Sequence, residues 1–131
     1  MTNFALADLI ARLNISSKKR LVSVRVVFTK FSLNVLHIFL KNGIINGLTI
    51  ENNYITVYLK YYMLKPVFRE ITIVSRPGKR VYWTLNFLSL KYNIANFSGF
   101  YVISTSKGLL TSNDCLLGLN ASGEIMLKVS I

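Results

Sequence analysis

The sequence has 131 residues, enough for one domain of ordinary size or two small lobes but not for a multidomain enzyme. Lysine and arginine number 16 against 5 aspartates and glutamates, so the formal net charge is +11, while 52% of the residues are apolar. This composition excludes disorder, because a disordered chain combines high charge with little apolar content. Cys115 is the single cysteine, which excludes a disulfide scaffold, and no apolar run is long enough to predict a membrane span.

The excess of basic residues is the first indication of function. A small folded domain with many cations and few acids is destabilised by its own charge unless a polyanion neutralises it. Nucleic acid is therefore the favoured partner, and an anionic membrane surface is the alternative. Neither long helix predicted below gathers its cations on one face, so a peripheral membrane protein is the weaker interpretation.

The first half of the chain predicts two helices and a sheet. Leucines and isoleucines at helical spacing predict a first helix capped by Thr2 or Asn3, and a polar basic loop follows over residues 16–20. Gly43 ends the second helix, and Asn52-Asn53 between two β-branched and aromatic runs predicts a hairpin turn. The predicted elements are a helix, a strand, a second helix and the two hairpin strands: 2–14, 21–28, 30–42, 48–51 and 54–62.

The second half predicts mostly strands. Thr111 with Asp114 three residues later is a capping-box pattern for a short helix, and Lys65-Pro66 closes the first lobe. We therefore expect an α+β fold of two lobes, residues 1–68 and 69–131, with the second lobe β-rich. Its predicted elements are the four strands 70–75, 81–84, 99–105 and 124–131, a short helix or turn over 85–91 and a short helix over 112–118.

Residues that could carry catalysis stand alone in this sequence. His37 falls inside the second predicted helix, where a partly buried structural imidazole is expected, and Cys115 is most simply a small packing residue. Ser104 and Lys107 match the Ser-x-x-Lys pattern of acyl-transferring enzymes, but the Ser-Asp-Asn and Lys-Thr-Gly elements of those enzymes are missing. No spacing of His or Cys suits a metal. We predict no catalytic residue, no metal, no cofactor and no small-molecule substrate.

Two segments suit contacts with a phosphate backbone. Residues 104–108 supply three hydroxyls, a cation and a flexible backbone at the end of an apolar strand, with the helix capped by Thr111 just beyond. Residues 76–83 place three cations around a tight turn beside Tyr82 and Trp83. The alternatives are an ordinary serine turn for the first segment and a solvated hairpin tip for the second.

These segments carry a resemblance to a known family. The runs 74–82 (VSRPGKRVY), 99–111 (GFYVISTSKGLLT) and 122–125 (SGEI) resemble small-subunit ribosomal protein eight of the bacterial and organellar type. Upstream, Ala7-Asp8-Leu9-Ile10 and residues 39–45 (FLKNGII) resemble the family's opening helix and the exit of its second helix. The resemblance covers nearly the whole chain with its spacing preserved.

The resemblance implies a protein without enzymatic activity that binds the central domain of small-subunit ribosomal RNA early in assembly. Its main RNA-contacting loop would be Ser104, Thr105, Ser106, Lys107 and Gly108, with the Gly123-Glu124 turn close by. A second segment near the same surface would comprise Arg76, Pro77, Gly78, Lys79, Arg80 and Tyr82. The first lobe would contribute Asn3, Arg12, Asn14, Thr29 and Lys30. Leu116 and Leu117, which replace arginines of the family, are expected to face a neighbouring ribosomal protein.

The resemblance therefore predicts a structural constituent of the small ribosomal subunit, with ribosomal RNA and neighbouring small-subunit proteins as partners. A stand-alone RNA-binding regulator of the same fold is the alternative. Residue usage of the A+T-rich type, the expected lack of a presequence and the bacterial-type motifs favour a mitochondrial ribosome in the matrix. Plastid and bacterial ribosomes are the alternatives for location.

Overall fold

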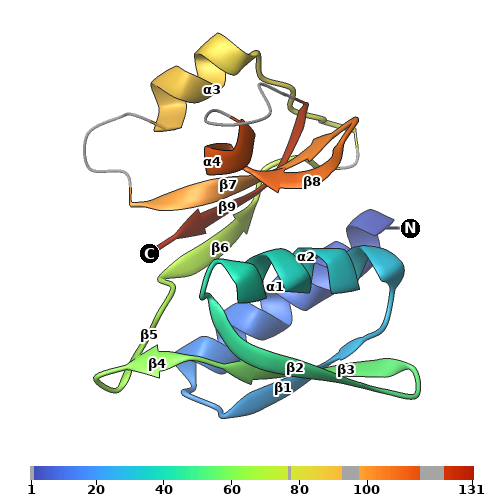
Figure 1. Cartoon of the computed structure of the whole chain (residues 1–131). Helices are drawn as coiled ribbons and strands as arrows, with labels where there is room; N and C mark the ends of the chain where they lie inside the picture. The colour runs from blue at the N-terminus through green and yellow to red at the C-terminus, as the bar shows by residue number, and fades with distance from the viewer. Residues whose placement is uncertain (1, 77, 93–97, 116–122) are drawn as a thin grey trace. The chain divides into compact units, whose positions relative to one another are not determined.

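The computed structural model describes residues 2–76, 78–92, 98–115 and 123–131, and shows the predicted α+β class (Figure 1). Helices begin the chain and antiparallel strands make up most of the remainder. The chain forms two compact units, residues 1–69 and 70–131. Each unit has its own sheet, so each is described by itself.

The first unit packs two helices on one face of a three-stranded antiparallel sheet of order β1-β3-β2 (Figure 1). A separate small hairpin, β4–β5, follows the sheet in the chain. The elements are α1 (Thr2–Lys18), β1 (Ser23–Val27), α2 (Lys30–Lys41), β2 (Ile45–Glu51), β3 (Tyr54–Leu59), β4 (Tyr61–Tyr62) and β5 (Lys65–Pro66).

The helices form where the apolar spacing and the end signals agree. The side chains that α1 and α2 bury recur at helical spacing: Leu6, Leu9, Ile10, Leu13, Val35, Leu36 and Phe39. The hydroxyl of Thr29 caps α2 by accepting a hydrogen bond of 3.0 Å from the backbone N–H of Ser32. Gly43 ends the helix with φ of +75°, which confirms the predicted terminator.

The first helix is longer than predicted, because the serines at its end are helical and buried. The polar basic loop expected over residues 16–20 is wrong at Ser16, Ser17 and Lys18, which α1 contains, and the two serines are buried. The hydroxyl of Ser17 donates to the carbonyl of Asn14 at 3.1 Å, so the helix itself satisfies this polar group. The predicted hairpin is confirmed, with Asn52 in the left-handed region and β2 beginning at Ile45.

The second unit is an antiparallel sheet of order β6-β9-β7-β8, with two helices on one face (Figure 1). A buried cluster lies between that face and the helices: Leu88, Tyr101, Ile103, Cys115 and Ile125. The elements are β6 (Glu70–Ile73), α3 (Leu85–Tyr92), β7 (Gly99–Thr105), β8 (Gly108–Thr111), α4 (Ser112–Asp114) and β9 (Glu124–Ser130).

Strand β8 is absent from the sequence-based prediction. Its four residues begin at Gly108 and end at Thr111, which the sequence marks only as a helix cap, a role the structure confirms. Of the predicted strand 81–84, Tyr82 alone forms a bridge, with Glu124. The end of the predicted helix 112–118 and the proposed docking residues Leu116 and Leu117 lie outside the described residues, as does Pro77.

Candidate nucleic-acid interface

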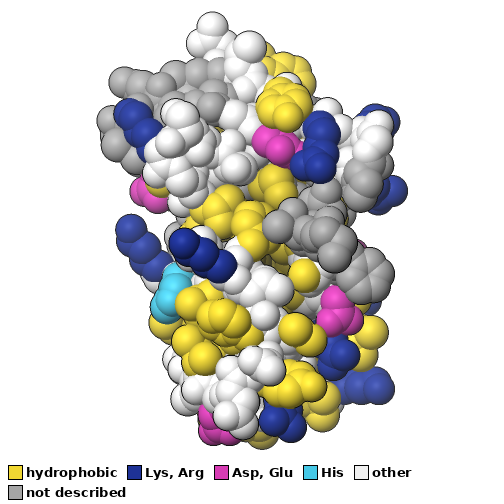
Figure 2. Space-filling view, turned by 90° about the vertical axis from the view of Figure 1, so that its right-hand side faces the viewer, with side chains coloured by type: hydrophobic (Ala, Val, Ile, Leu, Met, Phe, Trp, Pro, Cys, Tyr) yellow, Lys and Arg dark blue, Asp and Glu magenta, His cyan; other side chains and the backbone are white. Residues whose placement is uncertain are grey.

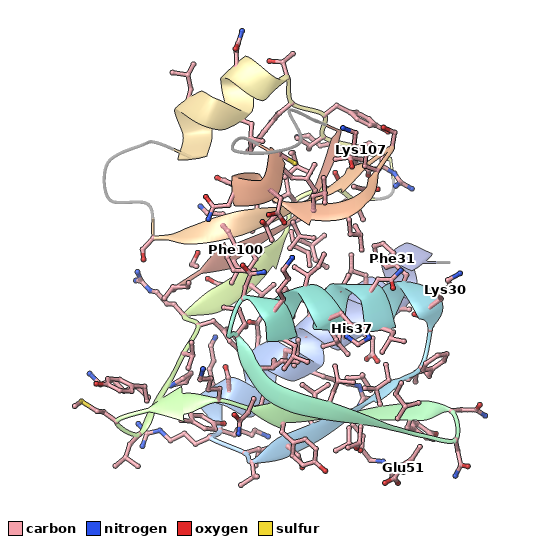
Figure 3. All side chains as sticks on the ribbon, in the orientation of Figure 1. Lys30, Phe31, His37, Glu51, Phe100 and Lys107 are labelled. Atoms are coloured by element: carbon pink, nitrogen blue, oxygen red, sulfur yellow. The ribbon has the colours of Figure 1, made fainter. Side chains whose placement is uncertain are left out.

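The serine-rich segment is the turn of the β7–β8 hairpin. Thr105 pairs with Gly108, so Ser106 and Lys107 form a two-residue connection, and Lys107 lies at its tip (Figure 3). The hydroxyl of Thr105 donates to the carbonyl of Gly108 at 2.8 Å and accepts from the backbone N–H of Lys107 at 3.1 Å. The expectation of a flexible backbone is therefore wrong, because strand pairing and these two bonds hold the turn.

This turn presents its polar groups unequally. Ser106, Lys107 and Gly108 are exposed, whereas Ser104 and Thr105 are half-buried. Because Thr105 already donates within the turn, its hydroxyl mainly shapes the backbone. Gly108 has φ of +107°, which strongly favours glycine. The exposed tip therefore offers a hydroxyl and an ammonium group on a rigid support.

The Gly123-Glu124 segment lies directly beside this hairpin. Glu124 pairs with Ser104 in the β7–β9 register. A Cβ atom at Gly123 would overlap the carbonyl oxygen of Ser104 and would lie 3.1 Å from its carbonyl carbon. Glycine is therefore required for the close approach of the two backbones at this point.

The basic turn of residues 76–80 is joined to the same strand. Arg76 and Lys79 exchange two backbone hydrogen bonds of 3.0 and 2.9 Å, and Gly78 between them has φ of +83°. The Arg80 guanidinium donates to Glu124 Oε2 at 3.0 Å. The backbone of Tyr82 forms an isolated antiparallel β-bridge with that of Glu124. Glu124 thus connects the basic turn to the serine hairpin.

Sequence analysis missed the buried anchor of this basic turn. The hydroxyl of Ser75 donates to the carbonyl of Ile125 at 2.6 Å and accepts from the backbone N–H of Val81 at 3.0 Å. Both chain segments that leave the turn are therefore tied to β9. No sequence signal singled out Ser75, because its role depends on a strand 50 residues further along the chain.

An aromatic pocket adjoins the basic turn. Tyr82, Trp83, Thr84 and Phe87 line a shallow pocket of about 320 Å³, and the side chain of Tyr82 is 67% exposed. The Trp83 ring meets the rings of Phe87 and Tyr101 edge to face, each with centroids 5.2 Å apart. Sequence analysis identified Tyr82 and Trp83 but not Phe87. Phe87 follows Trp83 by four residues at the start of a helix, and this spacing could have predicted that the two rings meet.

The first-unit candidates do not form one patch. On α1, Arg12 and Asn14 lie about half a turn apart at about 100° per residue, and the side chain of Asn3 is not among those described. Arg12 forms an ion pair with Asp8, one turn earlier on α1, with its Nε 3.0 Å from Asp8 Oδ2. Thr29 acts as the cap of α2, and Lys30 follows it as the exposed first residue of that helix (Figure 3).

The described residues offer little for catalysis or metal binding. They hold no group of three His, Cys, Asp or Glu side chains that could bind a metal ion. Cys115 is buried, which confirms its packing role, and burial together with the nearby Asp114 charge raises the pKa of its thiol. His37 is exposed, so the expected partly buried imidazole is wrong, because its position lies off the buried stripe of α2 (Figure 3).

Charge and apolar surface are mixed across the molecule. On the face drawn in Figure 2, lysine and arginine side chains are scattered among apolar side chains that reach the surface, with acids between them. Within the described part of the chain, no helix is long and apolar enough to cross a membrane.

A basic α+β chain with cations and hydroxyls on ordered turns is typical of small non-catalytic nucleic-acid-binding proteins. Comparison with known families is more specific, because the model of the family "Ribosomal protein S8" matches residues 5–129. The chain therefore belongs to the ribosomal protein S8 family, whose members are structural, non-enzymatic components of the small ribosomal subunit.

Individual relatives match over nearly their full length. The small ribosomal subunit protein uS8m of Acanthamoeba castellanii is 35% identical over 126 residues, which cover 95% of this chain and 98% of the relative. The uS8 protein of Anaplasma marginale is 38% identical over 129 residues, or 95% of each chain. That of Mesoplasma florum is 30% identical over 129 residues, covering 96% and 97%.

Proposed function

We propose that this chain binds the central domain of the small-subunit ribosomal RNA, chiefly through its second unit, and supports the folding of that RNA during assembly. The observation that carries the proposal is the connection of two basic turns through one strand. Glu124 at the start of β9 pairs with Ser104 below the Lys107 turn and accepts a hydrogen bond from Arg80 of the other turn. We call the two turns and the start of β9 the RNA-binding framework. It brings four cations together around the carboxylate of Glu124: Arg76, Lys79, Arg80 and Lys107.

The chemistry of this framework suits a structured RNA. Cations at exposed turns neutralise phosphates where RNA strands approach each other, and bound counterions are released to solvent. The Ser106 hydroxyl and the Lys107 ammonium donate to phosphate or ribose oxygens, while the rigid turn fixes the position of the protein on the RNA. The Glu124 carboxylate, held by Arg80, can accept from a ribose 2′-hydroxyl. RNA shape rather than base identity is therefore the expected source of specificity.

Tyr82 adds an aromatic surface to the basic turn. Its ring is largely exposed, and a base can stack on it with a gain of about 1–3 kcal/mol. Gly123 contributes by its lack of a side chain, which lets the two strands meet. We propose that Gly78 and Pro77, the latter outside the described residues, belong to the same RNA contact.

The first unit contributes separate, smaller contacts through Asn3, Arg12, Asn14, Thr29 and Lys30. Of these, Lys30 is the better cation, because Arg12 is paired with Asp8 and part of its charge is balanced. Thr29 acts indirectly, since its hydroxyl holds the start of α2. Loss of Lys30 should therefore weaken RNA binding less than loss of Lys107.

We further propose that the ribosome in question is mitochondrial. The similarity to the mitochondrial protein of Acanthamoeba castellanii supports this location, and the residue usage of the A+T-rich type agrees with it. Similarity to bacterial relatives keeps the bacterial ribosome as the competing location.

The test is the salt dependence of binding to a central-domain RNA transcript. Lys107→Ala should lower the affinity and reduce the slope of log K against log salt by about one unit, because one phosphate contact is lost. Lys41→Ala is the matched control, an exposed lysine in the last turn of α2, and should leave the slope unchanged. An unchanged slope for Lys107→Ala, or equal affinity for an unrelated RNA of the same length, would contradict the proposal.

A further inference from the structure

We propose that the β4–β5 hairpin docks a neighbouring protein of the small subunit, through an apolar pocket of that partner bordered by carboxylates. The proposal rests on the proposed function, because it requires the chain to lie in a ribosomal particle. It concerns the first unit, whereas the RNA-binding framework lies in the second. The hairpin projects beyond the sheet at the lower left of Figure 1.

The turn of this hairpin carries residues that do not suit its backbone. Tyr62 pairs with Lys65, so Met63 and Leu64 form a two-residue connection. Both have positive φ, +52° and +65°, which is the pattern of the type I′ turn. Asn-Gly is the preferred sequence for such a turn, because large side chains are strained in the left-handed region. Met and Leu therefore make the hairpin harder to fold, and they need another reason to be there.

The strained side chains are also the most exposed apolar groups of the unit. Tyr62, Met63 and Leu64 are 71%, 78% and 80% exposed, and we call these three residues the apolar tip. The Tyr61 hydroxyl donates to the carbonyl of Leu21 at 2.5 Å, which places exposed Leu21 and Val22 at the base of the hairpin. Apolar surface held out in this way gains stability only when a partner buries it.

Charge around the apolar tip defines the partner. Residues 18–25 and 58–69 contain no aspartate or glutamate. Their exposed cations are Lys18, Lys19, Arg20, Lys60, Lys65 and Arg69, together with Arg25, whose guanidinium lies over the Tyr54 ring at the other end of β3. Carboxylates at the border of the partner's pocket would complement these cations and set the orientation of docking.

RNA fits this surface less well than protein does. Phosphates would satisfy the cations, and Tyr62 could stack on a base, but Met63 and Leu64 have no group that RNA could hydrogen-bond. A protein pocket supplies apolar surface for the tip and charge for its border at the same time. A protein surface with both features is therefore the occupant that the residues favour.

A double substitution separates docking from folding, because it should raise the stability of the free chain and lower its incorporation into small subunits. Met63→Asn with Leu64→Gly installs the preferred turn sequence, so the Tm of the free chain should rise by a few degrees. In reconstitution of small subunits in competition with the unaltered chain, the same variant should be incorporated about tenfold less, since its apolar anchors are lost. Binding to the central-domain transcript should not change.

A matched control tests whether any exposed apolar side chain would behave in this way. Ile50→Thr removes a half-exposed apolar side chain from β2 of the same unit and should compete equally with the unaltered chain. Equal incorporation of the double variant would overturn the docking proposal while leaving the RNA-binding proposal intact. If the unaltered chain does not bind the central-domain transcript, the proposed function is overturned, and the docking proposal with it.

Photocrosslinking identifies the occupant directly. With p-benzoylphenylalanine in place of Met63, assembled subunits should yield a crosslink to apolar residues of a small-subunit protein that are flanked by Asp or Glu. The same probe in place of Asn53, the exposed turn of the β2–β3 hairpin, is the control. Crosslinks from position 63 to RNA or lipid would overturn the proposal. So would a yield of protein crosslinks from position 63 no higher than that from position 53.

Discussion

Gly123→Ala tests the close approach of β7 and β9 on which the candidate interface depends. The added Cβ would overlap the Ser104 carbonyl oxygen and lie 3.3 Å from the Thr105 Cα, so all its neighbours are backbone atoms that cannot rotate away. Restoring ordinary contact requires a strand shift on the order of 1 Å. A shift of this size would break a backbone hydrogen bond between β7 and β9, and such a bond contributes about 1 kcal/mol. The overpacking itself costs roughly 1–3 kcal/mol more. We expect the free energy of unfolding to fall by about 2–4 kcal/mol.

Urea denaturation followed by circular dichroism measures this loss. Gly47→Ala is the control, because Gly47 has open space at its Cβ position and no positive φ, and its unfolding free energy should change by less than about 0.5 kcal/mol. The shift at Gly123 also moves Glu124 and its Arg80 partner, so affinity for the RNA transcript should fall by about tenfold under conditions where the variant is folded. Equal stability of the two variants would refute the close approach of the strands.

Two further substitutions test the structural roles of Thr29, which caps α2, and of the buried Cys115. Thr29→Ala should lower the unfolding free energy by about 1 kcal/mol through loss of the α2 cap, whereas Thr29→Ser should retain most of it; equal losses in urea melts would contradict the capping role. Burial raises the pKa of the Cys115 thiol in the folded chain. The neutral thiol should therefore contribute its full stability below the ordinary cysteine pKa of about 8.5, and the unfolding free energy should decline as the pH rises further. Cys115→Ser should lack this decline with pH. Iodoacetamide should label Cys115 slowly in the native chain and rapidly in urea, and rapid native labelling would contradict its burial.

The elements that the sequence predicts well are those with complete local signals. Thr29, the apolar stripe and Gly43 define α2 from both ends, and Asn52-Asn53 defines the turn between β2 and β3. Strand β7 has the predicted bounds because its apolar run begins at Gly99. In each case residues close in the chain determine the local structure.

The elements that the sequence missed depend on distant partners. Strand β8 has four residues and owes its pairing to β7, while the end of α1 is helical because Ser16 and Ser17 are buried. The β4–β5 turn could not be predicted, since Met63 and Leu64 are poor residues for positive φ. Local propensity is overridden at these positions by tertiary context.

The candidate site divides in the same way. Sequence motifs indicated both basic segments, but they did not show that Glu124 connects them or that Ser75 anchors one of them to β9. Those links run between residues far apart in the chain. Local hydrogen bonds of Thr105 to Gly108 and Lys107 order the turn that the sequence had described as flexible, which supports preformed recognition of RNA shape.

Sedimentation tests the central claim most directly. A lysate of cells that make this chain is run through a sucrose gradient with and without ribonuclease, and the chain is followed by mass spectrometry. We expect the chain to peak with the small subunit and to leave that fraction after ribonuclease treatment. A chain that stays near the top of the gradient in both runs would contradict it.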